Sequence, residues 1–107
     1  MNKPIRTEKE ADQELEEAIH QYEERRPGLG SDFLAAIDDV LKRVSRFPES
    51  GAPVPKVPGH LPVRRVSLKR FPYHIVYLVT PEAIRVLAFA HHRRRPFYWL
   101  PRTSALR

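Results

Sequence analysis

Most of the residues that could do chemistry in this sequence stand close together, in the run from His91 to Trp99. The run reads HHRRRPFYW, so it combines imidazoles, guanidinium groups and aromatic rings. Imidazoles exchange protons near neutral pH, arginines carry a permanent positive charge, and aromatic rings stack on bases. This combination favours a surface that binds a polyanion, either nucleic acid or an acidic protein segment.

The charge of the chain is divided between its two halves. Residues 1–50 carry 8 Lys and Arg against 12 Asp and Glu, a net charge of −4, whereas residues 51–107 carry 11 against 1, a net charge of +10. Glu82 is the only acid of the second half. The positive field is therefore concentrated in the part of the chain that holds the candidate residues.

Composition argues against several other classes of protein. The chain has no cysteine, which excludes disulfides and thiolate sites. A zinc site beside the histidines would need more ligands than residues 51–107 offer, since they contain no cysteine and one acid. We therefore expect neither a metal nor a cofactor. No apolar run approaches the ~18 residues of a membrane span, and the polar, acidic start is unlike a signal peptide. We therefore expect a cytoplasmic protein without a membrane partner.

Two helices are predicted in the acidic half. Thr7 and Glu10 fit a capping box, after which apolar residues recur at helical spacing to Tyr22, while Glu10, Glu14, Glu17 and Glu24 should take the outer surface. The sequence PGLG from position 27 ends this helix. Ser31 or Asp32 should cap a second helix that runs to Pro48, and the short connection predicts an antiparallel hairpin.

Three strands are predicted in the basic half. Residues 48–62 contain five prolines and two glycines, which favours a rigid loop. Residues 63–69, 73–80 and 83–91 then form an antiparallel meander, with Tyr73, Ile75, Tyr77 and Val79 on one face of the middle strand. In the first strand, Arg65 and Lys69 should share a face.

Together these elements predict an α+β fold in which an N-terminal helical hairpin packs on a small antiparallel sheet. A short strand at residues 3–6 leads, so the order is β-α-α-β-β-β with a short C-terminal tail. With 107 residues the chain suits a single domain, made of an acidic hairpin with its leading strand (1–50), a proline-rich loop (51–62) and a basic meander with its tail (63–107).

This order of elements resembles the RelE/ParE superfamily of type II toxin–antitoxin toxins. The resemblance rests on the tract from Tyr73 to Tyr77 (YHIVY), the strand from Ile84 to His91 (IRVLAFAH), the basic-aromatic residues that follow, and the P-x-x-G from Pro48 to Gly51. It implies a toxin of the plasmid-stabilisation type that a cognate antitoxin, with an acidic or amphipathic segment, holds inactive in a hetero-oligomer.

The superfamily has two mechanistic branches, and the resemblance leaves both open. RelE-like members cut messenger RNA in the ribosome without a metal, and on that interpretation His92, Arg95 and Tyr98 would be catalytic. ParE-like members inhibit DNA gyrase and are not known as nucleases. The position that holds a phosphate-stabilising arginine in RelE-like enzymes is His74 here, which favours the gyrase branch slightly.

The remaining candidates would bind nucleic acid or the antitoxin. They are Arg65, Lys69, His74, His91, Arg93 and Arg94. Because adjacent strand residues point to opposite faces, only one of His91 and His92 should face a given site, and Trp99 is expected to anchor the tail by packing. An alternative of another class is a non-toxic nucleic-acid-binding module or an inactive toxin relative.

Overall fold

The computed structural model describes residues 2–104 and contains one five-stranded mixed sheet. The strands are β1 (Ile5–Thr7), β2 (Ala52–Pro53), β3 (Val63–Ser67), β4 (Tyr73–Val79) and β5 (Ile84–His91), in the order β1-β5-β4-β3-β2. The predicted meander is confirmed, because β3, β4 and β5 pair antiparallel. The sheet as a whole is not antiparallel, since β1 pairs with β5 in the parallel direction.

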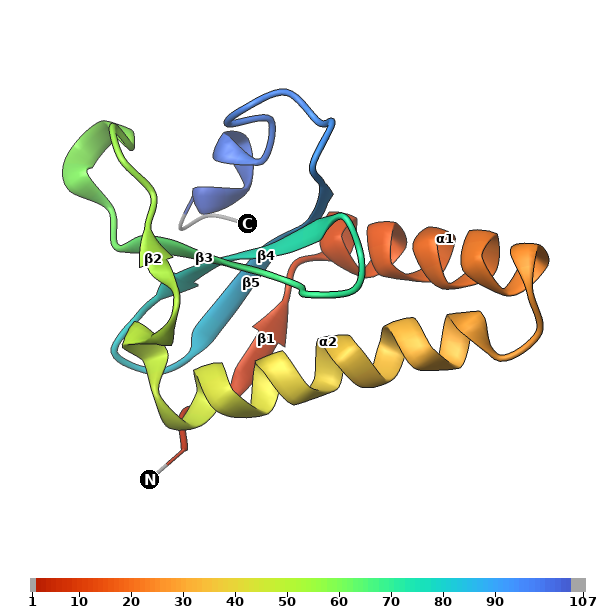
Figure 1. Ribbon diagram of the computed structural model, residues 1–107. Coiled ribbons are helices and arrows are strands. Elements are labelled where there is room, and N and C mark those ends of the chain that lie inside the picture. Colours follow the sequence, from red (N-terminus) through yellow and green to blue (C-terminus); the bar gives the residue numbers. More distant parts are fainter. Residues whose placement is uncertain (1, 105–107) are drawn as a thin grey trace.

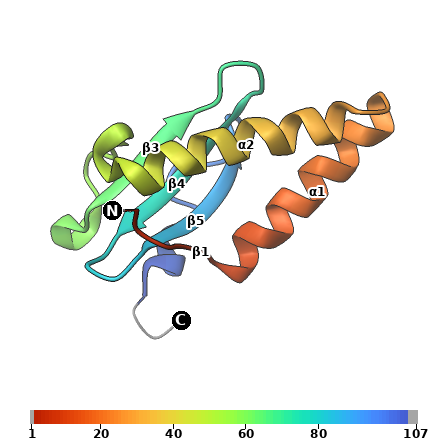
Figure 2. The same cartoon turned by 90° about the horizontal axis from the view of Figure 1, so that it is seen from below.

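The sheet lies between two unlike layers (Figure 1). Helices α1 (Lys9–Arg25) and α2 (Leu29–Arg46) cover one face, and the C-terminal tail folds over the other. Seen from below, the two helices diverge across the sheet and meet beyond its edge (Figure 2). Neither helix within residues 2–104 has the length and apolar character that crossing a membrane would require.

The turn between the helices depends on glycine. A Cβ atom on Gly30 would lie 2.7 Å from the backbone oxygen of Ile19, so only glycine permits this close approach of α2 to α1. The carboxylate of Glu23 accepts hydrogen bonds from the N–H groups of Gly28 and Gly30, at 2.9 and 3.0 Å. An acid from α1 therefore satisfies donors at the N-terminus of α2.

The predicted helix caps are wrong. The N-cap of the first helix is Glu8, whose side chain makes no capping hydrogen bond, because Thr7 belongs to β1. The second helix begins at Leu29 after Gly28, so Ser31 and Asp32 lie inside it rather than at its cap. In both cases tertiary contacts of the flanking segment, rather than a local cap, set where the helix begins.

The predicted alternation in the middle strand is confirmed. Ile75 and Tyr77 belong to the cluster under the helices, whereas Val76 and Leu78 belong to the cluster under the tail. Both faces of β4 are thus buried, which explains its nearly continuous apolar sequence. The cluster under the helices consists mainly of Tyr22, Phe33, Ile37, Val44, Phe71, Ile75, Tyr77, Val86 and Phe89.

The proline-rich segment is fixed to the sheet by one buried tyrosine. The Tyr77 hydroxyl donates to the Pro48 carbonyl at 2.7 Å and accepts from the Gly51 N–H at 2.9 Å. A Cβ on Gly51 would lie 2.5 Å from that hydroxyl. The P-x-x-G sequence therefore has a structural role, and it leads into β2, a two-residue edge strand within the segment predicted as a loop.

Candidate functional site

The C-terminal tail, residues 92–104, folds back over the face of the sheet that the helices leave open (Figure 1). Trp99 holds it there, with 4% of its surface exposed, among Val57, Val76, Leu78 and Leu87. The expectation that Trp99 packs is therefore confirmed. The tail ends in a 3₁₀ helix at Leu100–Thr103.

Glu14 of α1 joins the tail to the rest of the molecule. Its carboxylate accepts hydrogen bonds from the Tyr98 hydroxyl at 2.7 Å and from both terminal nitrogens of Arg102, at 3.0 and 3.3 Å. Arg94 lies 3.9 Å away. Only 15% of the Glu14 side chain is exposed and 12% of Arg102, so this is a nearly buried ion pair.

The same two residues complete an open strand edge. The strand β1 ends opposite Val86, which leaves the edge of β5 without a partner further along. There the Phe89 N–H donates to Glu14 at 3.2 Å, and Arg102 donates to the Leu87 carbonyl at 2.9 Å. Glu14 and Arg102 thus satisfy backbone groups that a neighbouring strand would otherwise satisfy.

The prediction that Glu14 lies on the outer surface of its helix is wrong. Ala18 and Tyr22 follow Glu14 at intervals of four residues and are buried, so the spacing places Glu14 on the inner face. The signal in the sequence that Glu14 is buried was an acid at helical spacing from buried apolar residues. The sequence could not supply the hydrogen-bond partners of Glu14, because Tyr98 and Arg102 are more than eighty residues away.

A second ion pair supports the end of the tail. The guanidinium of Arg85 lies 3.2 Å from the Glu8 carboxylate and donates to the Arg102 carbonyl at 2.8 Å. Both side chains of this pair are less than one fifth exposed. Two arginines of the basic half, Arg85 and Arg102, are therefore neutralised within the fold and are not part of a binding surface.

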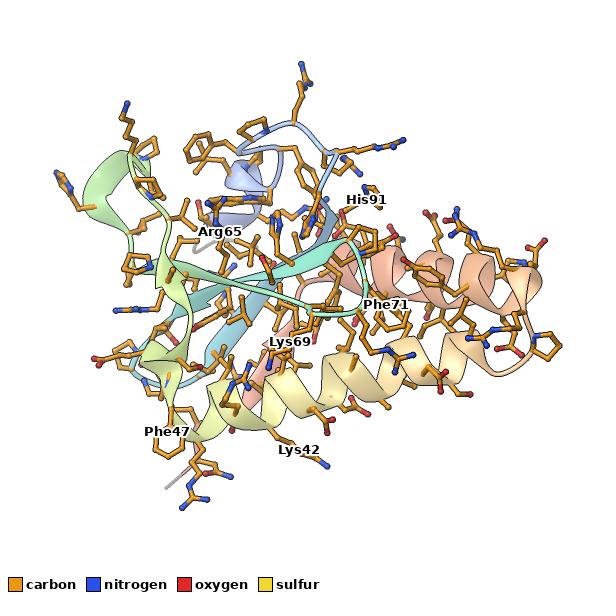
Figure 3. The ribbon with its side chains drawn as sticks, viewed as in Figure 1. Lys42, Phe47, Arg65, Lys69, Phe71 and His91 are labelled. Atoms are coloured by element: carbon orange, nitrogen blue, oxygen red, sulfur yellow. The ribbon has the colours of Figure 1, made fainter. Side chains whose placement is uncertain are left out.

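A cavity of about 270 Å³ lies between the tail and the sheet. This volume is slightly below the roughly 300–1,000 Å³ typical of small-molecule sites. Figure 3 shows Arg65 on the tail side of the sheet, over β3. The lining residues are Val54, Pro55, Arg65, His74, Val76, Ala90, His91, His92, Arg94, Arg95, Pro96, Phe97, Tyr98 and Trp99.

Two histidines meet at this cavity. The rings of His74 and His92 are stacked, with centroids 5.4 Å apart and planes inclined by 21°. Burial lowers the pKa of His74, and the neighbouring charges of His92 and Arg65 lower it further. At neutral pH, therefore, His74 is an uncharged imidazole in this environment.

The adjacent histidine lies against the other face. The ring of His91 meets the ring of Tyr73 edge-on at 5.1 Å, and Tyr73 packs against the helical cluster. Desolvation lowers the pKa of His91, with Arg93 and His92 as further causes, and its Nδ1 accepts a hydrogen bond from the Arg93 N–H at 3.1 Å. The two histidines are thus directed apart, as the alternation predicts.

Comparisons with known proteins agree with this architecture. Residues 5–96 match the family model described as "ParE toxin of type II toxin-antitoxin system, parDE". The chain belongs to the ParE toxin family. It is 30% identical to the protein named Toxin ParE2 from two strains of Mycobacterium tuberculosis, over 97 residues that cover 90% of this chain and 88% of that protein.

A solved structure shares the fold of this ParE-family toxin. It is titled "Chromosomal ParDE TA system from P. aeruginosa", with a TM-score of 0.69 and 22% sequence identity, and the match covers 83% of this chain and 95% of that one. The chain is thus a type II toxin, as the resemblance implied, and membership of a toxin–antitoxin family implies a cognate antitoxin.

The fold brings some candidates of this ParE-family toxin together and separates others. The residues that line the cavity include Arg65, His74, His92, Arg94, Arg95 and Tyr98. His91 borders the cavity at the end of β5, but its ring packs on Tyr73 at the other face of the sheet. Lys69 does not, because β3 ends at Ser67 and Lys69 lies in the connection to β4, beside Phe71 in Figure 3. Arg93 is exposed on the turn after β5 and also lies outside the cavity.

The cations of the toxin differ in how far they are already paired. Arg94 lies 3.8 Å above the Tyr98 ring and near Glu14, and Arg64 donates to the Gly51 carbonyl at 2.7 Å. Within residues 2–104, by contrast, the side chains of Arg65, Arg93 and Arg95 make no ion pair with a carboxylate. Of the four candidate arginines, these three are therefore available to a partner.

Tyr98 is poorly placed for proton transfer. Burial and its hydrogen bond to Glu14 raise the pKa of Tyr98 well above its ordinary value of 10.0. A general acid works best when its pKa lies near the operating pH, so the shift is in the unfavourable direction. Among residues 2–104 there is also no cluster of three or more His, Asp or Glu residues that could hold a metal ion.

Proposed function

We propose that this ParE-family toxin inhibits DNA gyrase without catalysing a reaction, and that its cognate antitoxin neutralises it. The observation that carries the proposal is the hydrogen bond from the Tyr98 hydroxyl to Glu14 at 2.7 Å. In this hydrogen bond the phenolic proton of Tyr98 at the cavity is bound to a structural partner. A hydroxyl used in this way, with a raised pKa, is not available to protonate a leaving group.

The middle strand supports the same branch. The RNA-cleaving mechanism needs a cation to stabilise the crowded phosphorane, and on β4 the residue facing the cavity is His74, whose pKa is lowered. A neutral imidazole supplies far less stabilisation than a guanidinium. The cavity therefore has no cation on β4 and no free phenolic proton at Tyr98, and its positive charge comes from Arg65, Arg94 and Arg95.

The antitoxin is expected to cover the unpaired cations. These are Arg65 on β3 and Arg93 and Arg95 on the tail. An acidic or amphipathic segment would complement their charge. We infer a hetero-oligomer of toxin and antitoxin. The proposed target, gyrase acting on chromosomal DNA, places this activity in the cytoplasm.

An expression experiment and an assay with purified protein test the proposal. Induction of the toxin alone should arrest growth, inhibit DNA supercoiling and induce the DNA damage response, while messenger RNA stays intact. Coexpression with the cognate antitoxin should restore growth. In vitro, the purified toxin should inhibit gyrase supercoiling, and the toxin–antitoxin complex should not. Supercoiling that continues unchanged at saturating toxin would contradict the proposed target.

The alternative is a RelE-like messenger RNA endoribonuclease. The observation that favours it is that His92 and Arg95, two of the candidate catalytic residues, line the same cavity. In that case induction should produce messages cut at ribosome-bound codons, and His92→Gln or Arg95→Gln should abolish the cuts. Growth without any defect would instead indicate the non-toxic binding module or the inactive relative.

A further inference from the structure

The cavity between the tail and the sheet combines positive charge with an absence of nearby acids. Arg65 enters from β3, His74 from β4, and His92 and Arg95 from the tail. Of the described residues that line the cavity, none is a carboxylate. The acid behind this part of the tail, Glu14, is already bound by Tyr98 and Arg102. An anion entering here meets donors and no competing acid.

His74 resists protonation in the stacked pair, because burial and the groups beside it lower its pKa. Two imidazolium rings at 5.4 Å would repel each other, and Arg65 adds a third positive charge beside them. An anion between these groups reverses the balance, because it stabilises the charged imidazole. Binding of an anion and uptake of a proton are therefore linked at this site.

We propose that this cavity binds a phosphodiester group of a single-stranded nucleic acid, and that His74, stacked on His92, takes up a proton as it does so. The site does not depend on the proposed gyrase target, and it requires no cleavage. Its ligand is recognised by charge and by shape, with Arg65 and the two imidazoles as donors.

A phosphodiester fits the surroundings better than the carboxylate of an acidic peptide. Its tetrahedral oxygens can accept from donors that converge from different elements, as Arg65, His74 and His92 do. Phe97, half-buried at the cavity and 5.7 Å from the Trp99 ring, offers an aromatic surface on which an adjacent base can stack. Arg95, exposed and unpaired, can meet the next phosphate.

The groups that act on the histidine pair come from three directions. Arg65 faces it from β3, Arg94 and Arg95 line the cavity from the tail, and His91 stands at the end of β5. The loop that supplies Val54 and Pro55 contributes no charge to the lining. Tyr98, the remaining titratable group of the lining, stays a neutral phenol because its pKa is raised. The charged neighbours are thus all basic, so the entering anion is what drives protonation.

Calorimetry with a thymidine tetranucleotide that lacks terminal phosphates tests the linkage. The charge of this probe does not change at neutral or mildly acidic pH, so any proton exchanged on binding belongs to the protein. Affinity should be higher at about pH 6 than at about pH 7.5, on either side of the ordinary histidine pKa of ~6.5. Heats measured in two buffers of different ionisation enthalpy should report proton uptake. Equal affinity at both pH values, or no binding, overturns the proposal.

Variants locate the site with matched controls. Arg65→Gln should weaken binding about tenfold or more, as expected for loss of a charged hydrogen bond. Arg93→Gln removes the same charge beside the cavity without altering its lining and should have a much smaller effect. His74→Gln should abolish most of the proton uptake, and His92→Gln, at an exposed position, provides a second test if the first variant does not fold. Equal losses for Arg65→Gln and Arg93→Gln would indicate diffuse attraction only.

Two further probes distinguish other ligands. Inorganic sulfate keeps a constant charge over this pH range, so sulfate binding without tetranucleotide binding would restrict the site to free anions and overturn the nucleic-acid assignment. A polyglutamate peptide that binds more tightly than the tetranucleotide, with the same dependence on Arg65, would assign the cavity to an acidic protein partner instead. Preference for the tetranucleotide, with proton uptake, supports the proposal.

Discussion

The hydroxyl of Tyr98 donates a hydrogen bond to Glu14 across 2.7 Å, which ties the C-terminal tail to the first helix. The same carboxylate holds Arg102 in two hydrogen bonds. One acid of the negatively charged half therefore organises the part of the basic half that forms the cavity wall. The shape of the candidate site depends on a contact between opposite ends of the chain.

Glu14→Gln should destabilise the toxin by about 3 kcal/mol, because it removes one partner of a nearly buried ion pair and leaves Arg102 without its counter-charge. Urea unfolding measures the free energy. Glu17→Gln, on an exposed position of the same helix, should change it by less than about 0.5 kcal/mol. Equal effects of the two substitutions would show that Glu14 has no special structural role.

Tyr77→Phe should cost about 1–3 kcal/mol, since the Pro48 carbonyl and the Gly51 N–H both lose their partner in a buried place. Tyr73→Phe is the matched control on the same strand and the same face, because within the described chain the Tyr73 hydroxyl makes no hydrogen bond. Chemical denaturation compares them. A Tyr77→Phe protein as stable as Tyr73→Phe would contradict the proposed anchoring of the proline-rich segment.

Gly30→Ala should destabilise the helical hairpin by more than 1 kcal/mol, although alanine is the better helix former. The added methyl group would lie 2.7 Å from the Ile19 backbone oxygen, and a helix backbone cannot move away as a side chain can. Thermal unfolding measures the change, with Ser31→Ala at the neighbouring exposed position as control. Stabilisation by Gly30→Ala would refute the tight crossing of the helices.

Stability should fall as the solution is acidified below about pH 6.5. The pKa of His74 is lowered in the folded protein, so the unfolded chain binds a proton more readily than the native state. The contribution of His74 is therefore complete above its unfolded pKa of ~6.5 and is lost as the pH falls toward its lower folded pKa. Urea midpoints between about pH 5 and 7.5 should decline less steeply in His74→Gln than in the parent protein. Parallel pH profiles would exclude His74 as a cause.

Much of the fold could be predicted from local patterns. Three predictions were correct: the apolar stripes of the two helices, the alternation through Tyr77 on β4 and the packing of Trp99. All three follow from which side chains are buried away from water. The helix caps were wrong, because Thr7 has a strand partner in β5 and Gly28 has a hydrogen bond to Glu23 that no local motif reveals.

The sequence by itself determined the order of elements, the division of charge and the concentration of basic and aromatic residues after β5, since these follow from residue type and spacing. Only the tertiary structure decided which cations remain available. Arg102 forms an ion pair with Glu14, and Arg85 forms one with Glu8. Lys69 lies away from the cavity, whereas the ring of His74 stacks on that of His92. Pairing between distant residues depends on how packed elements approach each other, and spacing along the chain carries no record of that approach.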